Sequence, residues 1–145
     1  MLKLIIADDE RIIRETISTI INWKEYDIEV VGLCKNGMET YDMIMDETPD
    51  IDIRMPGMDG LELIRRISGT DLNVQFIILS GYGEFEYAKE AMKNGVKYYL
   101  LKPCNELQII DCIEQCKKDC YQQKSDPQLL TAICSLLIKG NKSGP

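Results

Sequence analysis

Five polar side chains directly follow short apolar runs in this sequence, and together they could do chemistry. They are Asp8, Asp9, Asp52, Ser80 and Lys102. Polar groups at the carboxyl ends of parallel strands meet in one crevice, where three carboxylates repel one another unless a cation neutralises them. Mg²⁺ prefers oxygen ligands and suits such a set. With the lysine and the hydroxyl added, the cluster fits a phosphoryl group.

The carboxylate of Asp52 is the candidate nucleophile of this set. An aspartate needs only in-line positioning and charge neutralisation to attack a phosphoryl group. The chain contains no histidine, so the most common general base is missing. This absence favours the acceptance of an already activated phosphoryl group over the hydrolysis of a stable ester.

The elements that must position these residues alternate between short apolar runs and amphipathic stretches. Such alternation predicts βαβ units on a parallel sheet, here five strand–helix pairs in a doubly wound α/β domain over residues 1–123. The predicted strands are Leu2–Ala7, Ile28–Cys34, Ile51–Ile53, Val74–Ser80 and Tyr98–Leu101. The predicted helices are Arg11–Asn22, Met38–Glu47, Leu61–Ile67, Glu84–Lys93 and Glu106–Gln123.

Residues 124–145 are predicted to form a linker with one extra helix, Pro127–Lys139, and a disordered tail, Gly140–Pro145. Asp126 followed by Pro127 is typical of a helix start. Apolar residues gather on one side at helical spacing, namely Leu129, Leu130, Ile133, Cys134 and Leu137. A helix this short is marginal alone. We therefore expect it to dock on the domain or to pair two chains, which predicts a homodimer.

Composition excludes several other classes of protein. The net charge of −7 opposes binding to nucleic acid by this chain alone, since that requires a clustered cationic surface. No apolar run approaches the length of a membrane span, and no signal peptide is evident, so a cytoplasmic location is expected. The six cysteines are then predicted to be free thiols. Cys112, Cys116 and Cys120 share a helix face with isoleucines, which indicates core packing and not a metal site.

Four segments together resemble the receiver domains of two-component response regulators, which are CheY-like proteins. They are Ile5–Glu10, Asp52–Gly60, Leu79–Tyr82 and Tyr98–Pro103, and they occur in the order typical of that family. The resemblance extends from Leu2 to about Gln123. Asn22–Tyr26 with Val30–Gly32, and Gly81–Tyr82 with Phe85–Ala88, are similar to the subgroup with an AraC-type helix-turn-helix output region.

The resemblance implies a flavodoxin-like fold and a role for each matching residue. Asp52 would accept the phosphoryl group, and Lys102 and Ser80 would contact it. Asp9, Asp52, Asp8 and the Arg54 carbonyl would hold Mg²⁺. Tyr99 would be the aromatic switch, and Lys102–Pro103 would be a cis peptide.

The family resemblance also implies partners and a pathway. A sensor histidine kinase would supply the phosphoryl group to a signalling phosphoacceptor, which is no enzyme beyond slow self-hydrolysis. The switch would control a transcriptional output region that binds DNA in the full-length protein, with no membrane partner.

One departure from the family concerns the strand before Asp52. Receivers carry an apolar strand of several residues there, whereas Pro49-Asp50 is followed only by Ile51. About three residues are missing, which is on the order of 10 Å of strand. A degenerate receiver that acts as a protein-binding module is therefore an alternative. A haloacid-dehalogenase-type phosphohydrolase is disfavoured, because that family spaces its two aspartates two apart while Asp8 and Asp9 are adjacent.

Overall fold

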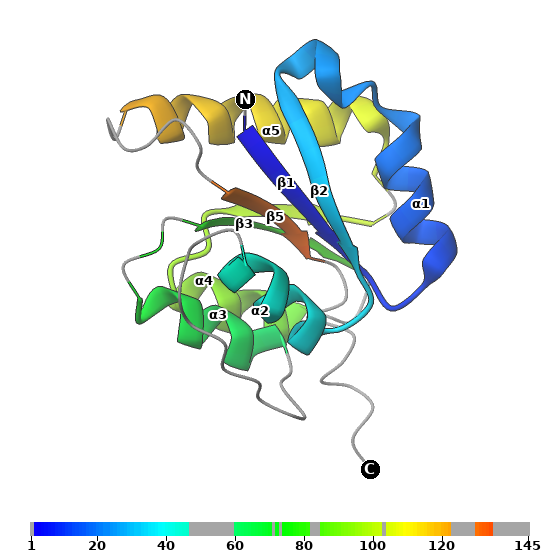
Figure 1. Cartoon of the computed structure of the whole chain (residues 1–145). Coiled ribbons are helices and arrows are strands. Elements are labelled where there is room, and N and C mark those ends of the chain that lie inside the picture. Colours follow the sequence, from blue (N-terminus) through cyan, green and yellow to red (C-terminus); the bar gives the residue numbers. More distant parts are fainter. Residues whose placement is uncertain are drawn as a thin grey trace.

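Five parallel strands form one sheet in the order β2-β1-β5-β3-β4 (Figure 1). The computed structural model describes residues 2–46, 60–70, 72, 74–81, 85–102, 104–122 and 130–134. The strands are β1 (Leu2–Ala7), β2 (Ile28–Cys34), β3 (Val74–Ser80), β4 (Tyr98–Leu101) and β5 (Leu130–Cys134). The central place in the sheet thus belongs to the strand that comes last among the described ones.

Helices cover both faces of this sheet. They are α1 (Arg11–Ile20), the 3₁₀ turn η1 (Trp23–Tyr26), α2 (Gly37–Asp46), α3 (Gly60–Ser68), α4 (Phe85–Lys93) and α5 (Glu106–Gln122). Figure 1 shows α1 and α5 on one face and α2, α3 and α4 on the other. The result is a three-layer α/β arrangement in which both faces of the strands are buried.

Alternation along β1 divides the core into two clusters. Leu2, Leu4 and Ile6 pack with residues of α1 and α5. Ile5 and Ala7 pack with residues of α2, α3 and α4. Successive strand side chains point to opposite faces, so an uninterrupted apolar run such as Leu4–Ala7 serves both layers at once. This burial anchors the residue that follows β1, which is Asp8.

Local hydrogen bonds fix where two of the elements begin. The Asn36 carboxamide oxygen accepts from the Glu39 backbone N–H at 2.8 Å, which caps the first turn of α2. Asp27 adopts the left-handed conformation, with φ 60°, and so reverses the chain between η1 and β2. The Lys117 ammonium donates to the Tyr26 carbonyl at 2.5 Å and ties α5 to that turn.

Four of the predicted strands are confirmed with the predicted bounds, but the C-terminal prediction is wrong. Leu130–Cys134 lies in strand β5, not in a helix spanning Pro127–Lys139. A short apolar run fits either element by periodicity, and here β1 and β3 offer backbone partners on both sides. The prediction of a homodimer depended on the apolar face of that helix, so it no longer has structural support.

The predicted strand Ile51–Ile53 lies outside the described residues. Five parallel strands do form the sheet, but the predicted (βα)₅ succession of strand and helix is not confirmed, because β5 follows α5 and sits at the centre. Among the described residues, none of the helices is long and apolar enough to cross a membrane.

Candidate functional site

Asp8 directly follows β1 at the carboxyl edge of the sheet, and its side chain is fully buried. Three hydrogen bonds hold it in place. Its backbone N–H donates to the Cys34 carbonyl at 3.0 Å, and one carboxylate oxygen accepts from the Glu10 N–H at 2.8 Å. Its carbonyl accepts from the Arg14 guanidinium at 2.7 Å. A buried charge this well fixed is typical of a working site and not of a surface cap.

Lys102, which follows β4, supplies the opposite charge. Its Nζ lies 3.6 Å from Asp8 Oδ2, and its side chain is only 21% exposed. Among the described residues, this ammonium has no hydrogen-bond partner, so its donors remain available for another anion. The pair therefore offers a cation aimed at the crevice beside a buried carboxylate, which suits a phosphoryl oxygen.

Asp8, Asp9 and Glu10 bring their carboxylate oxygens within 4.8 Å of one another. Asp8 is buried, while Asp9 and Glu10 are exposed, so the cluster faces solvent from a rigid base. Oxygen ligands at this spacing suit a hard divalent ion, and Mg²⁺ binds through one or two carboxylates while it keeps several waters. These residues fit the magnesium site predicted for Asp8 and Asp9.

Of the other predicted site residues, the structure describes only some. Ser80 is the last residue of β3 and pairs with Leu101, so its backbone lies at the same edge of the sheet as Asp8. Tyr99 lies on β4, is partly buried and packs against the cluster under α2, α3 and α4. Asp52 and Arg54 lie outside the described residues, and so does Pro103 of the predicted cis peptide.

Arg14 and Glu10 were not assigned a role from the sequence. Arg14 sits one turn into α1 and reaches back to the Asp8 carbonyl, six residues earlier. Glu10 completes the acidic group. An arginine at that distance after an acidic strand end is an ordinary helix residue, so no sequence signal marked it. Glu10 could have been found, since it directly follows Asp8-Asp9.

Two thiols next to this edge are held in their neutral form. Burial raises the pKa of Cys34 to about 11, although a hydrogen bond with Thr40 acts to lower it. Burial also raises the pKa of Cys104, against the nearby Lys102 charge. Four of the six cysteines, Cys34, Cys104, Cys112 and Cys116, are free thiols, which agrees with the prediction for these four. Neutral buried thiols pack as small hydrophobes and do not act as nucleophiles.

An apolar hollow of about 530 Å³ opens beside Lys102. Ile13 and Ile17 of α1 and Ile109 of α5 form its walls, with Cys104 at the lip. Ile12 and Leu107 in the first turns of the same two helices are largely exposed, at 77% and 67%. Exposed apolar side chains and an apolar hollow on the same two helices are typical of a protein contact surface.

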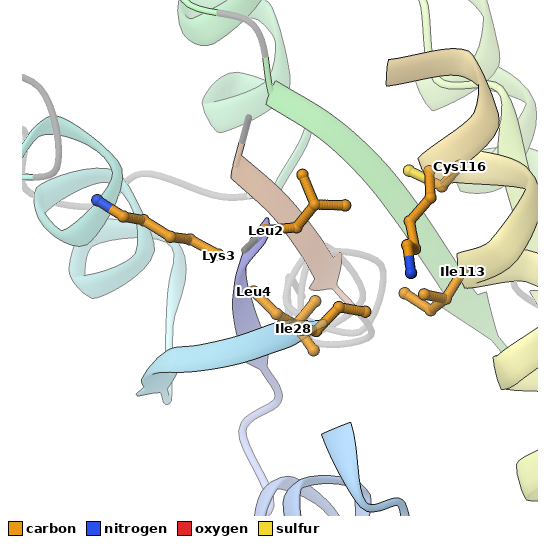
Figure 2. A pocket seen from close by; sticks show the side chains of 7 residues that line it. Leu2, Lys3, Leu4, Ile28, Ile113 and Cys116 are labelled. Carbon is orange, nitrogen blue, oxygen red and sulfur yellow. The ribbon is translucent and has the colours of Figure 1, made fainter. Parts of the chain in front are cut away.

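A second, enclosed cavity lies at the other end of the sheet between β1, β2 and α5 (Figure 2). Leu2, Leu4, Ile28, Ile113 and Cys116 surround it, and its volume is about 10 Å³. That space barely admits one water molecule and is lined by apolar groups. It is a small packing gap and not a ligand site.

The sheet, its two helical layers and the acidic edge define a parallel α/β protein with a cluster of carboxylates and a lysine at the carboxyl ends of its strands. The family described as response regulator receiver domain matches residues 4–114, which is most of the chain. The chain therefore belongs to the response regulator receiver family.

Relatives with this domain are named as transcriptional regulators. An uncharacterized transcriptional regulatory protein, YesN of Bacillus subtilis (strain 168), is 55% identical over 118 residues, covering 79% of this chain and 32% of that protein. The transcriptional regulatory protein HptR of Staphylococcus aureus (strain NCTC 8325 / PS 47) is 37% identical over 137 residues, covering 92% of this chain and 54% of HptR. The chain thus spans about a third to a half of these curated relatives.

Solved receiver domains share the fold. The receiver domain of AraT, a response regulator from Geobacillus stearothermophilus, superimposes with a TM-score of 0.73 at 36% identity, covering 85% of this chain and 98% of that one. A two component transcriptional regulator AraC from Clostridium phytofermentans ISDg gives 0.72 at 29% identity, covering 87% and 100%. The chain has the flavodoxin-like fold of receivers.

Proposed function

We propose that this chain is the phosphoryl-accepting receiver of a response regulator, with Asp52 as the acceptor and a sensor histidine kinase as the donor. The observation that carries the proposal is the buried Asp8 carboxylate with Lys102 Nζ 3.6 Å away, at the edge where Asp9 faces solvent. Asp52 begins the segment Asp52–Gly60, which resembles the family motif, and this resemblance supports Asp52 as the acceptor.

In the proposed reaction, a carboxylate oxygen of Asp52 attacks the phosphorus of a phosphohistidine. The new bond is a P–O bond to Asp52, and the P–N bond to the kinase histidine breaks with its electron pair going to the imidazole. Lys102 pairs with the phosphoryl oxygens, and the Ser80 hydroxyl donates to one of them. Asp8, Asp9, Asp52 and the Arg54 carbonyl would hold Mg²⁺, which supplies positive charge at the phosphoryl group.

The product of this reaction is a conformational state and not a released metabolite, so the activity is signalling with at most slow self-hydrolysis. Tyr99 would change its packing when Asp52 is phosphorylated. We propose the exposed Ile12 and Leu107 and the hollow beside Lys102 as the face that receives the kinase. In the full-length protein the output would be DNA binding by a separate region, in the cytoplasm. Two relatives named transcriptional regulatory proteins support a transcriptional output.

Incubation with acetyl phosphate and Mg²⁺ tests the proposal, followed by intact mass measurement. One added phosphoryl group is expected, and it should be absent in Asp52→Asn and after chelation of the metal. Asp42→Asn, on the surface of α2, is the matched control and should behave like the parent. Phosphorylation that persists in Asp52→Asn would contradict the assignment.

A second candidate is a protein-binding receiver that takes no phosphoryl group. The observation in its favour is that β5 fills the centre of the sheet, between β1 and β3. This candidate predicts that the chain binds a kinase domain equally well with Asp52 or Asn at that position while no mass is added.

A further inference from the structure

The turn from β1 into α1 carries the acidic cluster of Asp8, Asp9 and Glu10, and one side chain of α1 spans this turn. The Arg14 guanidinium donates to the Asp8 carbonyl at 2.7 Å. The Arg14 backbone N–H donates to the Glu10 carbonyl at 3.1 Å, in the first turn of the helix. The two hydrogen bonds therefore tie both ends of the acidic turn to one partly buried residue.

The carbonyl that accepts from Arg14 belongs to the peptide group between Asp8 and Asp9. A peptide group is planar, so the direction of this carbonyl also fixes the plane that contains the Asp9 Cα. Asp8 is held from other sides as well, because its N–H donates to the Cys34 carbonyl at 3.0 Å and its carboxylate accepts from the Glu10 N–H at 2.8 Å. The Arg14 bond adds a restraint on the peptide plane itself, and so on the point where the Asp9 side chain leaves the backbone.

The start of α1 makes this restraint more important. Glu10 occupies the cap position of the helix but makes no side-chain capping hydrogen bond, and the first turn contains no acidic residue. Side-chain caps and first-turn acids are the usual features that stabilise the beginning of a helix. The geometry of the turn into α1 therefore depends on the bonds that Asp8 and Arg14 make.

The positive charge of Arg14 would by itself act against a metal ion at this edge of the sheet. Burial is the main influence on the pKa of Cys34 and raises it, while the Arg14 charge acts to lower that pKa, so the charge is felt at the end of β2. A cation near a divalent ion repels it. The charge of Arg14 and its hydrogen bond to Asp8 thus affect metal binding with opposite signs.

We propose that Arg14 is a positioning residue of the proposed magnesium site. Its bond to the Asp8 carbonyl holds the Asp8–Asp9 peptide in the orientation that lets the Asp9 carboxylate bind the ion, and this gain outweighs the repulsion from its charge. Arg14 acts through the backbone of Asp8 and not on the ion. The inference rests on the proposed function, because it names a residue that sets the metal affinity of that same site.

The dissociation constant for Mg²⁺, measured on the full chain, tests this role. Arg14→Met removes the charge and the donors but keeps a long apolar side chain at that place. Loss of a group that orients a metal ligand typically weakens metal binding by about 10- to 100-fold. We expect a weakening in this range for Arg14→Met, whereas loss of a nearby positive charge alone would tighten binding. Isothermal titration with Mg²⁺ and electron paramagnetic resonance with Mn²⁺ measure the affinity.

Arg11→Met is the matched control. Arg11 is the same type of residue in the same helix, but its guanidinium pairs with the exposed Glu15 at 2.9 Å. The affinity of this variant for Mg²⁺ should equal that of the parent or slightly exceed it. Arg14→Lys keeps the charge and a donor, so its affinity should lie between those of the parent and Arg14→Met. Arg14→Gln, which is neutral and shorter, replaces Arg14→Met if that variant does not fold.

Melting temperatures without metal separate this role from a purely structural one. If Arg14→Met melts earlier but binds Mg²⁺ as the parent does, Arg14 only supports the fold and the inference is wrong. Tighter binding of Mg²⁺ in that variant would mean that the charge dominates, and it overturns the inference too. Both results leave the proposed function intact. The proposed function fails separately if the parent binds neither ion and takes up no phosphoryl group from acetyl phosphate.

Discussion

Asp8 and Lys102 show how single residues lower the energetic cost of burying an acidic side chain. A fully buried carboxylate is costly unless a cation and hydrogen-bond donors offset its charge, and here Lys102 and the Glu10 N–H do so. Because Asp9 and Glu10 add two more carboxylates within 4.8 Å, one lysine leaves negative charge over. The residue set therefore favours binding of a divalent cation.

Magnesium should stabilise the folded chain for this reason. A ligand that binds only the folded state adds about 2.7 kcal/mol to the free energy of unfolding at a hundred times its Kd. We expect the melting temperature to rise with Mg²⁺ in the parent and the rise to vanish in Asp9→Ala. Glu29→Ala removes an exposed acid of β2 outside the cluster and should keep the full rise. A melting temperature indifferent to millimolar Mg²⁺ would argue against a formed site.

Cys34 predicts a pH dependence of stability. Its pKa is raised from 9.0 to about 11 by burial, so between these values the unfolded thiol loses its proton while the folded thiol keeps it. Its contribution is therefore complete below pH 9 and is lost as the pH rises toward 11. In Cys34→Ala, the fall in free energy of unfolding over this window should be shallower by up to about 1 kcal/mol per pH unit. Denaturant titrations at pH 8 to 11 measure it, and parallel curves would refute the pKa shift.

At the scale of elements, the contact between β2 and α2 depends on a residue without a side chain. A Cβ added at Gly32 would lie 3.0 Å from both Cγ and Cε of Met43. That distance is too short for a relaxed contact, so the methionine would have to move. The close approach explains why glycine stands in the middle of this strand.

Gly32→Ala should lower the free energy of unfolding by about 1–2 kcal/mol, as for other small-to-large changes in packed cores. Adding Met43→Leu, which shortens the crowding side chain, should recover part of the loss. Gly69→Ala is the control, because its Cβ would meet only backbone oxygens at 3.6 Å. Chemical denaturation measures all three, and additive losses for Gly32 and Met43 would show that the two do not interact.

The sequence predicted the elements that carry a strong local signal. β1, β2, β3 and β4 have the predicted bounds because each is a compact apolar run between turn residues, and Asp8 and Lys102 meet because both follow such runs. β5 escaped prediction because a run such as Leu130–Cys134 suits a helix or a strand equally by periodicity. Backbone pairing with β1 and β3 makes this run a strand, and both of these partners lie far away in the sequence.

At the scale of the whole molecule, β5 joins two halves of the sheet that, among the described strands, share no other strand pair. β2 with β1 forms one half, and β3 with β4 forms the other. Ala132 is paired on both sides, with Ile5 and with Phe76. Loss of its N–H therefore breaks the ladder at the centre of the molecule.

Ala132→Pro should for this reason lower the free energy of unfolding by about 3 kcal/mol, the usual cost of proline inside a regular element. Lys142→Pro, close to the C-terminus and outside β5, is the control and should be nearly neutral. Thermal melts of the two variants beside the parent decide the point. Equal melting temperatures would mean that the chain does not depend on β5.

The place of β5 also sets the order in which the chain can fold. Leu4 must find Thr131, and this pairing spans nearly the entire sequence. Contacts so distant along the chain are slow to form, because a large loop must close before any pairing stabilises it. During synthesis, the facing edges of β1 and β3 could not pair with β5 until residues 130–134 had left the ribosome. The growing chain thus passes through a stage in which the edges of β1 and β3 lack β5. Chaperones or neighbouring nascent chains would encounter these edges during that stage.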